Sequence, residues 1–350
     1  MKYLLGLLVF VPIALILDLG DIGGHPAVFV TSAAAMIPLA AVLGRATEEV
    51  AVYTGPKVGG LLNATLGNAA ELIITIVALR EGLVDVVKAS IAGSIIGNIL
   101  VVLGFSALLG GLKHGTQTFN PMTASTNATL MSLAVVSLTI PAVFSLGGDS
   151  GPTKHDLELL SDWMAGILIA LYGLYLLFTF VTARSPGQQE VTEHGQATMS
   201  LTTAIVVLAI ATGAIVVMSE ILVGAIEPTA KAWGLSDLFI GVMLVPLIGN
   251  IAEHLVAVQV AMANKMELAI GIAVGSGLQI ALFVTPVLVL FGAIFGHKMT
   301  LVFNGYELAA LVAATLIAVL ISVDGESNWL EGAELISLYA MLGIAFYFVP

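Results

Sequence analysis

The chain has 350 residues, of which 59% are hydrophobic and only 10% are charged, and its formal net charge is −12. Soluble domains are about 25% charged, so the composition excludes an ordinary soluble protein, while the acidic balance argues against nucleic acid as a partner. No cysteine is present, which excludes disulfides and thiolate metal sites. A mean hydropathy of +1.07 instead predicts an all-α protein that spans a lipid bilayer.

Apolar runs separated by turn residues predict about 11 transmembrane helices with short connections. The first run could be a signal peptide, but no small-residue cleavage site follows it before Asp18 and Asp21, so we expect a retained span. The only stretch that resembles a linker is 183–198. The predicted spans cover residues 3–19, 26–44, 58–80, 86–110, 122–144, 160–182, 199–224, 236–262, 267–293, 300–322 and 330–349.

One polar motif occurs twice inside these apolar spans. Residues 67–71 (GNAAE) recur as 249–253 (GNIAE), an offset of 182 positions, and with this offset residues 93–94 (GS) meet 275–276 (GS). A carboxylate in hydrocarbon costs several kcal/mol unless it is paired, hydrated, protonated or bound to a cation. Because the repeated positions are glycine, serine, amide and carboxylate residues, the repeat predicts one site built from both halves of the chain.

The repeat also predicts the domain organisation. If residues 1–22 form an extra N-terminal helix, residues 23–182 and 199–350 are two units of five spans each, joined by the linker 183–198. An odd number of spans makes the second unit enter the membrane from the opposite side, which is the inverted-repeat architecture of many transporters. Lys and Arg residues divide six to five between the two sides, so they do not set the orientation.

In each copy of the motif the asparagine and the glutamate are three residues apart, on one face of a helix. The preceding glycine permits a local break that frees backbone carbonyls to act as ligands. In the following spans, Ser94 and Asn98 are four residues apart and Ser276 and Gln279 are three apart, so each pair also shares a face. The predicted cation site consists of Glu71, Glu253, Asn68, Asn250, Ser94, Ser276, Asn98 and Gln279.

The chemistry of this set favours a hard cation. Carboxylate, amide and hydroxyl oxygens suit Ca²⁺, whereas zinc sites usually recruit imidazole or thiolate. One divalent ion or two protons neutralise Glu71 and Glu253, and burial of a carboxylate favours its protonated form, so protons compete for the same oxygens. We therefore expect Ca²⁺ as a transported substrate and no cofactor. Alternatively, the asparagines and glutamates are structural, and the serines bond to the carbonyls of their own helices.

Two further residues are candidate accessory groups. His254 is the only one of six histidines placed in the middle of a span, where it relays protons or bonds to a neighbouring backbone group. Glu220, near the end of the span 199–224, either guides cations or protons into the site or marks the membrane interface.

At these residues the chain resembles the calcium/cation–proton exchanger family, within the calcium/cation antiporter superfamily. The resemblance implies about 11 spans with the first outside the repeats, and it implies Glu71 and Glu253 as the carriers of Ca²⁺ and H⁺. It also implies that the spans 26–44 and 199–224 form a gating pair that slides against the rest. The linker departs from the family, because it has only Glu190 and Glu193 where many relatives carry a dense acidic run. The matching segments are 59–71 (GGLLNATLGNAAE), 249–254 (GNIAEH) and 275–281 (GSGLQIA), with support at 119–120 and 324–332.

The sequence thus predicts a secondary antiporter that exchanges Ca²⁺ for H⁺ by alternating access at a midplane site. The long N-terminal extension of plant relatives is absent, which favours a multi-pass protein of a prokaryotic plasma membrane and leaves a homo-oligomer open. One alternative is a sodium/calcium exchanger, although such relatives usually have a proline beside the key acid and neither Glu71 nor Glu253 has one. A passive cation channel could use the same oxygens. An intramembrane metalloprotease would need an H-E-x-x-H pair, which the chain lacks, so we expect no enzyme.

Overall fold

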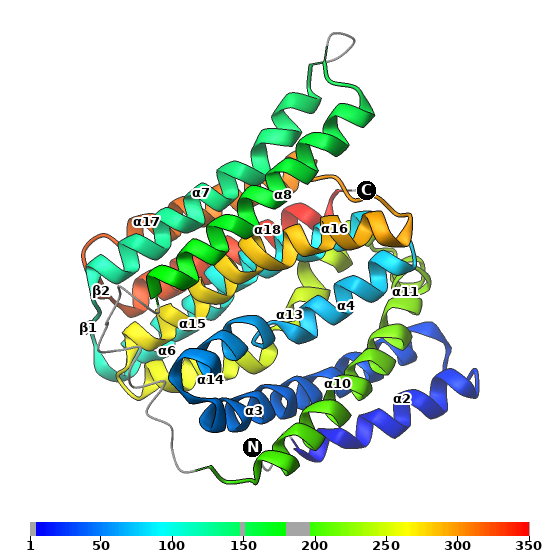
Figure 1. Cartoon of the computed structure of the whole chain (residues 1–350), viewed down its shortest axis with the longest axis horizontal. Helices are drawn as coiled ribbons and strands as arrows, with labels where there is room; N and C mark the ends of the chain where they lie inside the picture. Colours follow the sequence, from blue (N-terminus) through cyan, green and yellow to red (C-terminus); the bar gives the residue numbers. More distant parts are fainter. Residues whose placement is uncertain (1–4, 148–150, 180–196, 350) are drawn as a thin grey trace.

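The computed structural model describes residues 5–147, 151–179 and 197–349. Over these residues the chain is almost entirely helical, and long helices run side by side through the molecule (Figure 1). Seven helices are long and apolar enough to cross a membrane, or eight if the bent pair Ile226–Trp233 and Asp237–Gly249 counts as one span. The predicted class, an all-α membrane protein, is therefore confirmed. The remaining predicted spans coincide with shorter or interrupted helices, so the larger span count stays a prediction.

The first half of the chain begins with two short helices and continues with longer ones. Its elements are the 3₁₀-helix η1 (Leu7–Val9), α2 (Phe10–Leu19), α3 (Gly24–Leu66), α4 (Ala69–Arg80), α5 (Val84–Gly97), the π-helix η2 (Asn98–Val102), α6 (Leu103–His114), β1 (Gln117–Thr118), α7 (Pro121–Ser145) and α8 (Lys154–Leu177). Side chains mark where helices begin. Asn120 caps α7, and Thr153 forms a capping box with Asp156 at the start of α8.

Helix α3 is longer than the sequence predicted, because it continues through the expected connection at 45–57. The one non-helical residue inside it is Gly55, with φ 80° and ψ 170°, a conformation that glycine adopts without strain. The helix therefore bends at Gly55 instead of ending before it.

The second half repeats this organisation. Its elements are α10 (Leu201–Gly224), α11 (Ile226–Trp233), α12 (Asp237–Phe239), the π-helix η5 (Ile240–Leu244), α13 (Val245–Gly249), α14 (Ile251–Met262), α15 (Met266–Gln279), the π-helix η6 (Ile280–Val284), α16 (Thr285–Phe295), α17 (Gly305–Ile321), β2 (Glu326–Ser327) and α18 (Trp329–Tyr347). The π-helices η2 and η6 begin at residues 98 and 280, which differ by the offset of the sequence repeat. The span predicted at 300–322 starts later, at Gly305, because Asn304 caps α17.

The two halves interlock through matched contacts. Helix α6 packs on α14 as α4 packs on α16, and α5 packs on α17 as α7 packs on α15. The short strands β1 and β2 pair antiparallel and join the two halves at one end. The continuous helical segment Val84–His114 is the most central span, since 78% of its apolar window is buried within the molecule. Each half therefore completes the core of the other, as an inverted repeat requires.

Helices α2, α3 and α10 lie together along one side of the molecule (Figure 1). α3 and α10 are in extensive contact with each other, and α2 packs against both. The two spans expected to form the gating pair are thus neighbours. The linker predicted at 183–198 falls mostly outside the described residues, which resume at residue 197.

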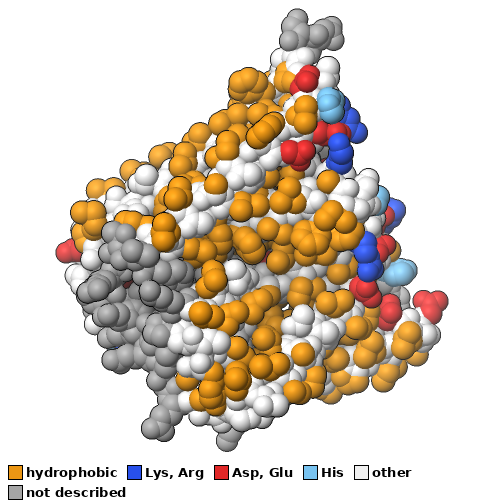
Figure 2. Space-filling model, viewed as in Figure 1, with side chains coloured by type: hydrophobic (Ala, Val, Ile, Leu, Met, Phe, Trp, Pro, Cys, Tyr) orange, Lys and Arg blue, Asp and Glu red, His pale blue; other side chains and the backbone are white. Residues whose placement is uncertain are grey.

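Charged side chains mark an end of the helix bundle. Apolar side chains cover most of the face seen in Figure 2, and most of the Lys, Arg, Asp and Glu side chains on it gather at one edge. Arg80 binds Glu220 at 3.0 Å, and Lys298 binds Glu158 at 2.8 Å. The hydrogen bond from Lys298 to Glu158 raises the pKa of the Lys298 ammonium. The apolar belt and the charged edge are the pattern of a protein that sits across a bilayer.

Candidate functional site

Both copies of the repeated motif interrupt a helix. Asn68 lies between α3 and α4 with φ −97° and ψ 28°, and Asn250 lies between α13 and α14 with φ −88° and ψ 3°. Glycine before each asparagine weakens the helix, and asparagine tolerates such bridge conformations. Glu71 and Glu253 consequently lie in the first turn of a new helix, where the positive end of the helix dipole favours a negative charge.

The two glutamates approach each other from opposite halves of the chain. A β-carbon on Gly249 would lie 3.1 Å from Glu71 Cγ and 3.2 Å from Glu71 Oε1, so the carboxyl of Glu71 packs directly on the second copy of the motif. The carboxylates of Glu71 and Glu253 also interact electrostatically. Glu71 is buried and Glu253 is partly buried.

Amide side chains cross between the halves around the glutamates. Asn68 Nδ2 donates to Gln279 Oε1 at 2.5 Å, which links α4 to the end of α15. Asn250 Nδ2 donates to Ser94 Oγ at 3.2 Å and to the Pro246 carbonyl at 2.9 Å. Each asparagine of the repeated motif is therefore held by the span that follows the other copy.

Two more of the predicted residues join this cluster. Asn98 Nδ2 donates to Asn250 Oδ1 at 3.4 Å, and Ser276 hydrogen-bonds the Glu253 carboxylate. The structure thus brings together all eight residues that the sequence singled out. Asn98 and Gln279, which are one position out of register in the repeat, each bond the asparagine of the opposite half, Asn98 as donor and Gln279 as acceptor.

Several oxygens at the cluster have no protein partner. Within the described residues, Asn68 Oδ1, Asn98 Oδ1 and Glu253 Oε2 are buried and make no hydrogen bond. A buried unpaired oxygen costs about 1–3 kcal/mol, so a ligand that these three oxygens bind would be stabilised by the recovered interactions. Such oxygens can bind a hard cation.

The accessory residues fall in different settings. His254 Nε2 is buried and has no hydrogen-bond partner within the described residues, so the expected backbone bond is not formed at this nitrogen. Glu220 lies away from the cluster at the charged edge, where it is half exposed and paired with Arg80. This ion pair agrees with the interpretation of Glu220 as a residue of the membrane interface.

The sequence did not single out Pro246, and it placed Gly93 in the repeat without predicting its contact. The carbonyl of Pro246 accepts both the backbone N–H and the side-chain amide of Asn250. A β-carbon on Gly93 would lie 2.0 Å from the Val242 carbonyl oxygen, so α5 and η5 touch backbone to backbone beside the site. A proline within an apolar span was the available signal for Pro246.

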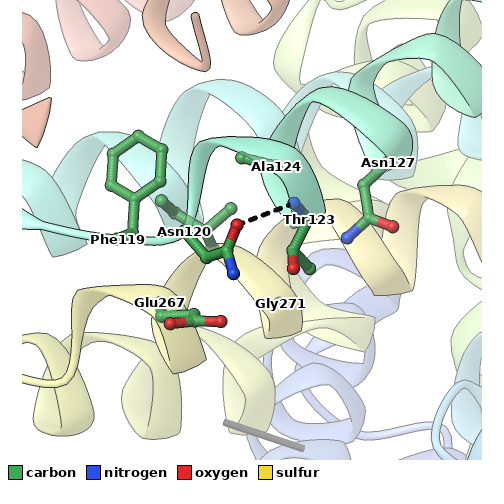
Figure 3. Close-up of a pocket in the computed structure, with 8 residues that line it drawn as sticks. Phe119, Asn120, Thr123, Ala124, Asn127, Glu267 and Gly271 are labelled. Atoms are coloured by element: carbon green, nitrogen blue, oxygen red, sulfur yellow. Dashed lines mark hydrogen bonds between the residues drawn. The ribbon is translucent and has the colours of Figure 1, made fainter. Parts of the chain in front are cut away.

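A small cavity of about 20 Å³ lies between the start of α7 and α15 (Figure 3), and neither Glu71 nor Glu253 lines it. This volume holds about one water molecule. Asn120 faces Glu267 there but already accepts hydrogen bonds from the Met122 and Thr123 backbone, so its contact is that of a helix cap. The cavity is lined by Phe119, Asn120, Thr123, Ala124, Asn127, Glu267, Ile270 and Gly271, none of them in the predicted cation site.

Replacement of Asn250 by alanine should weaken cation binding without unfolding the protein. Asn250→Ala removes the hydrogen-bond partner of both Asn98 and Ser94 and leaves their buried polar atoms unpaired. Each unpaired polar atom costs about 1–3 kcal/mol of free energy. We expect Ca²⁺ affinity, measured by calorimetry on purified protein, to fall by roughly tenfold or more. Asn63→Ala is the matched control, because Asn63 is exposed on α3, and it should bind Ca²⁺ like the unmodified protein. Equal affinity of Asn250→Ala and the unmodified protein would contradict a role for the amide cluster.

Comparison with known proteins gives the family. A family model described as sodium/calcium exchanger protein matches residues 24–181 and 203–348. The chain belongs to this family. It is 44% identical to a Ca²⁺/H⁺ antiporter of Aphanothece halophytica, over 99% of this chain and 96% of that protein. It is also 44% identical to the Ca²⁺/H⁺ antiporter ChaA of Bacillus subtilis, over 89% of each chain.

A solved structure of this family has the same fold. The structure of native YfkE matches the chain with a TM-score of 0.86 and 40% identity, over 99% of each chain. The resemblance to the calcium/cation–proton exchangers is therefore confirmed. With bacterial relatives and several apolar helices, the chain is a multi-pass membrane protein of the prokaryotic type.

Proposed function

We propose that this protein is a secondary antiporter that exchanges Ca²⁺ for H⁺ at a site shared by Glu71 and Glu253. The observation that carries the proposal is the meeting of the two carboxylates, from opposite halves, beside buried oxygens that lack a partner. Relatives 44% identical to the chain over nearly its whole length are named Ca²⁺/H⁺ antiporters, which supports the same pair of substrates.

In this proposal Ca²⁺ binds between the glutamates. Their two negative charges balance the ion, while Asn68 Oδ1 and Asn98 Oδ1 supply neutral oxygens that have no other partner. Ser94 and Ser276 lie next to this set and fix the orientation of Asn250 and Glu253.

Protons then release the ion. Protonation of both carboxylates removes the charge that holds Ca²⁺ and leaves a neutral site. The conformational change between the two membrane faces costs less free energy with a neutral site than with two unpaired carboxylates in the apolar interior. Exchange is obligatory because an empty and doubly charged site resists the conformational change, whereas the calcium-loaded and the doubly protonated site are both neutral.

Alternating access needs elements that move relative to the site. The helix breaks at Asn68 and Asn250 divide the site-bearing spans. The part of α3 before the kink at Gly55 packs with α10 along one side of the molecule. We propose that this pair moves across the site-bearing helices and exposes the glutamates to each membrane face in turn.

Proteoliposomes with imposed gradients test the exchange. An acidic lumen should drive Ca²⁺ accumulation above the external concentration, measured with ⁴⁵Ca²⁺, and a protonophore should abolish this accumulation because the pH gradient alone supplies its driving force. A sodium gradient at clamped pH should drive none. Uptake driven by sodium would instead support a sodium/calcium exchanger, and passive uptake without either gradient would support a channel.

A further inference from the structure

A buried carboxylate joins α3 to the start of α10, far from the cation site in sequence. Glu49 on α3 accepts hydrogen bonds from the backbone N–H of Thr198 at 2.9 Å and from that of Met199 at 3.2 Å. The hydroxyl of Thr198 also donates to Glu49. Glu49 is only 7% exposed, and the charge of its carboxylate is stabilised by these three donors together with the nearby Arg45 guanidinium.

Two neighbours on α3 complete this connection. Tyr53 donates its hydroxyl hydrogen to the Met199 carbonyl at 2.6 Å, and Arg45 donates to Thr198 Oγ1 at 3.4 Å. One face of α3 thus binds both donors and acceptors of Thr198 and Met199, which precede Ser200, the N-cap of α10. We refer to Arg45, Glu49, Tyr53, Thr198 and Met199 as the polar clamp.

The polar clamp adds hydrogen bonds to a charged group to the apolar packing between the two helices. Such bonds are stronger than those between neutral groups, and a carboxylate near a helix N-terminus is also stabilised by the helix dipole. Removing the carboxylate would leave two backbone N–H groups without their partner.

The other ends of the same helices are joined by apolar contact. The ring of Phe29, near the start of α3, meets Trp233 of α11 edge to face at 5.8 Å, and α11 directly follows α10. The polar clamp is not part of the internal repeat. The position that matches Glu49 in the second half, 182 residues later, is Lys231, which has the opposite charge. Among the described residues, the hydrogen bonds that join α3 to the chain around α10 lie at the end of the pair where α10 begins.

We propose that Glu49 is a positioning residue that keeps the part of α3 before Gly55 joined to α10 throughout the exchange cycle, so that these two helical segments move as one body. The inference rests on the proposed exchange of Ca²⁺ for H⁺, in which this pair moves relative to the site. Glu49 contacts neither Glu71 nor Glu253 in the cluster described above. It acts on the rate of the conformational change and not on cation binding.

The first test separates rate from binding. Glu49→Gln keeps the shape of the side chain but replaces one acceptor oxygen by a donor group and removes the charge. The maximal rate of ΔpH-driven ⁴⁵Ca²⁺ uptake should fall by about tenfold, while Ca²⁺ affinity stays within about twofold. Glu48→Gln is the matched control, because Glu48 is exposed on the same turn, and its rate should not change. An unchanged rate for Glu49→Gln, or an equal loss of affinity, would contradict the proposal.

The second test uses the absence of native cysteine. Glu49→Cys combined with Thr198→Cys removes the polar clamp, and a short bifunctional methanethiosulfonate reagent then bridges the two thiols covalently. The reduced double variant should be slow, bridging should restore the rate, and dithiothreitol should make it slow again. Either single cysteine variant should show no recovery with the reagent.

The outcomes distinguish this inference from the proposed function. If bridging stops exchange instead of restoring it, the two helices must separate during the cycle and the inference is wrong. If the unmodified protein catalyses no ΔpH-driven uptake, the proposed function itself fails before any variant is compared.

Discussion

Glu71→Gln and Glu253→Gln should each abolish ΔpH-driven ⁴⁵Ca²⁺ uptake in proteoliposomes. Glutamine keeps the size of the side chain but carries no charge and binds no proton. The substituted side chain therefore binds neither Ca²⁺ nor H⁺ as the carboxylate does. An opposite charge about 4 Å away contributes about 4 kcal/mol at an effective dielectric constant near 20, which corresponds to a loss of affinity of roughly a thousandfold. Calcium-for-calcium exchange should be lost as well, because it also requires the ion to bind.

The control for this experiment is Glu81→Gln. Glu81 follows α4, the helix that carries Glu71, but it is exposed and paired with Arg80 at the charged edge. This variant should transport at the normal rate. Uptake at the normal rate by both Glu71→Gln and Glu253→Gln, with each protein monodisperse in size-exclusion chromatography, would disprove the two-glutamate site.

Gly93→Ala should disrupt the contact between the two halves beside the site. The added β-carbon would lie 2.0 Å from the Val242 carbonyl oxygen and 2.6 Å from Pro246 Cγ, and neither backbone nor a proline ring can rotate away. η5 must therefore separate from α5, which costs about 1–3 kcal/mol of folding free energy and displaces Pro246 together with its hydrogen bond to Asn250. We expect a lower thermal unfolding midpoint in detergent and loss of calcium uptake.

The repeat supplies the control for this substitution. Gly275 occupies the matching position in the second half, yet a β-carbon there would meet no atom within 4 Å. Gly275→Ala should keep the unfolding midpoint of the unmodified protein. Equal destabilisation by the two substitutions would show that helix propensity, and not the contact with η5, sets the cost.

Much of the site was predictable from sequence because its chemistry is out of place in a membrane. Glu71 and Glu253 stand in apolar spans, where a carboxylate without a function is costly, and their surroundings recur at one offset. The helix breaks were also foreseeable, since a glycine and an asparagine precede each glutamate by a few residues. The charged residues Arg45, Glu48 and Glu49 are compatible with an interfacial helix, and the structure places them in α3. The continuity of this helix with the spans on either side, through the kink at Gly55, was not predicted.

The partners of individual side chains were not predictable. Asn68 bonds Gln279, which is 211 residues away, and Asn98 bonds Asn250, which is 152 residues away. Sequence spacing shows which residues share a helix face, but it does not show which face of another helix lies opposite. Likewise, Gly93 and Gly275 are equivalent in the repeat, and only the packing against η5 distinguishes them.

The sequence by itself determined the membrane class, the internal repeat and the pair of glutamates, because hydropathy, spacing and the cost of buried charge are properties of the local chain. The tertiary structure decided that the halves interlock, that each asparagine is held by the opposite half, and that Glu49 joins α3 to α10. These contacts depend on how helices distant in the sequence pack against each other, and short-range sequence patterns contain no record of that arrangement.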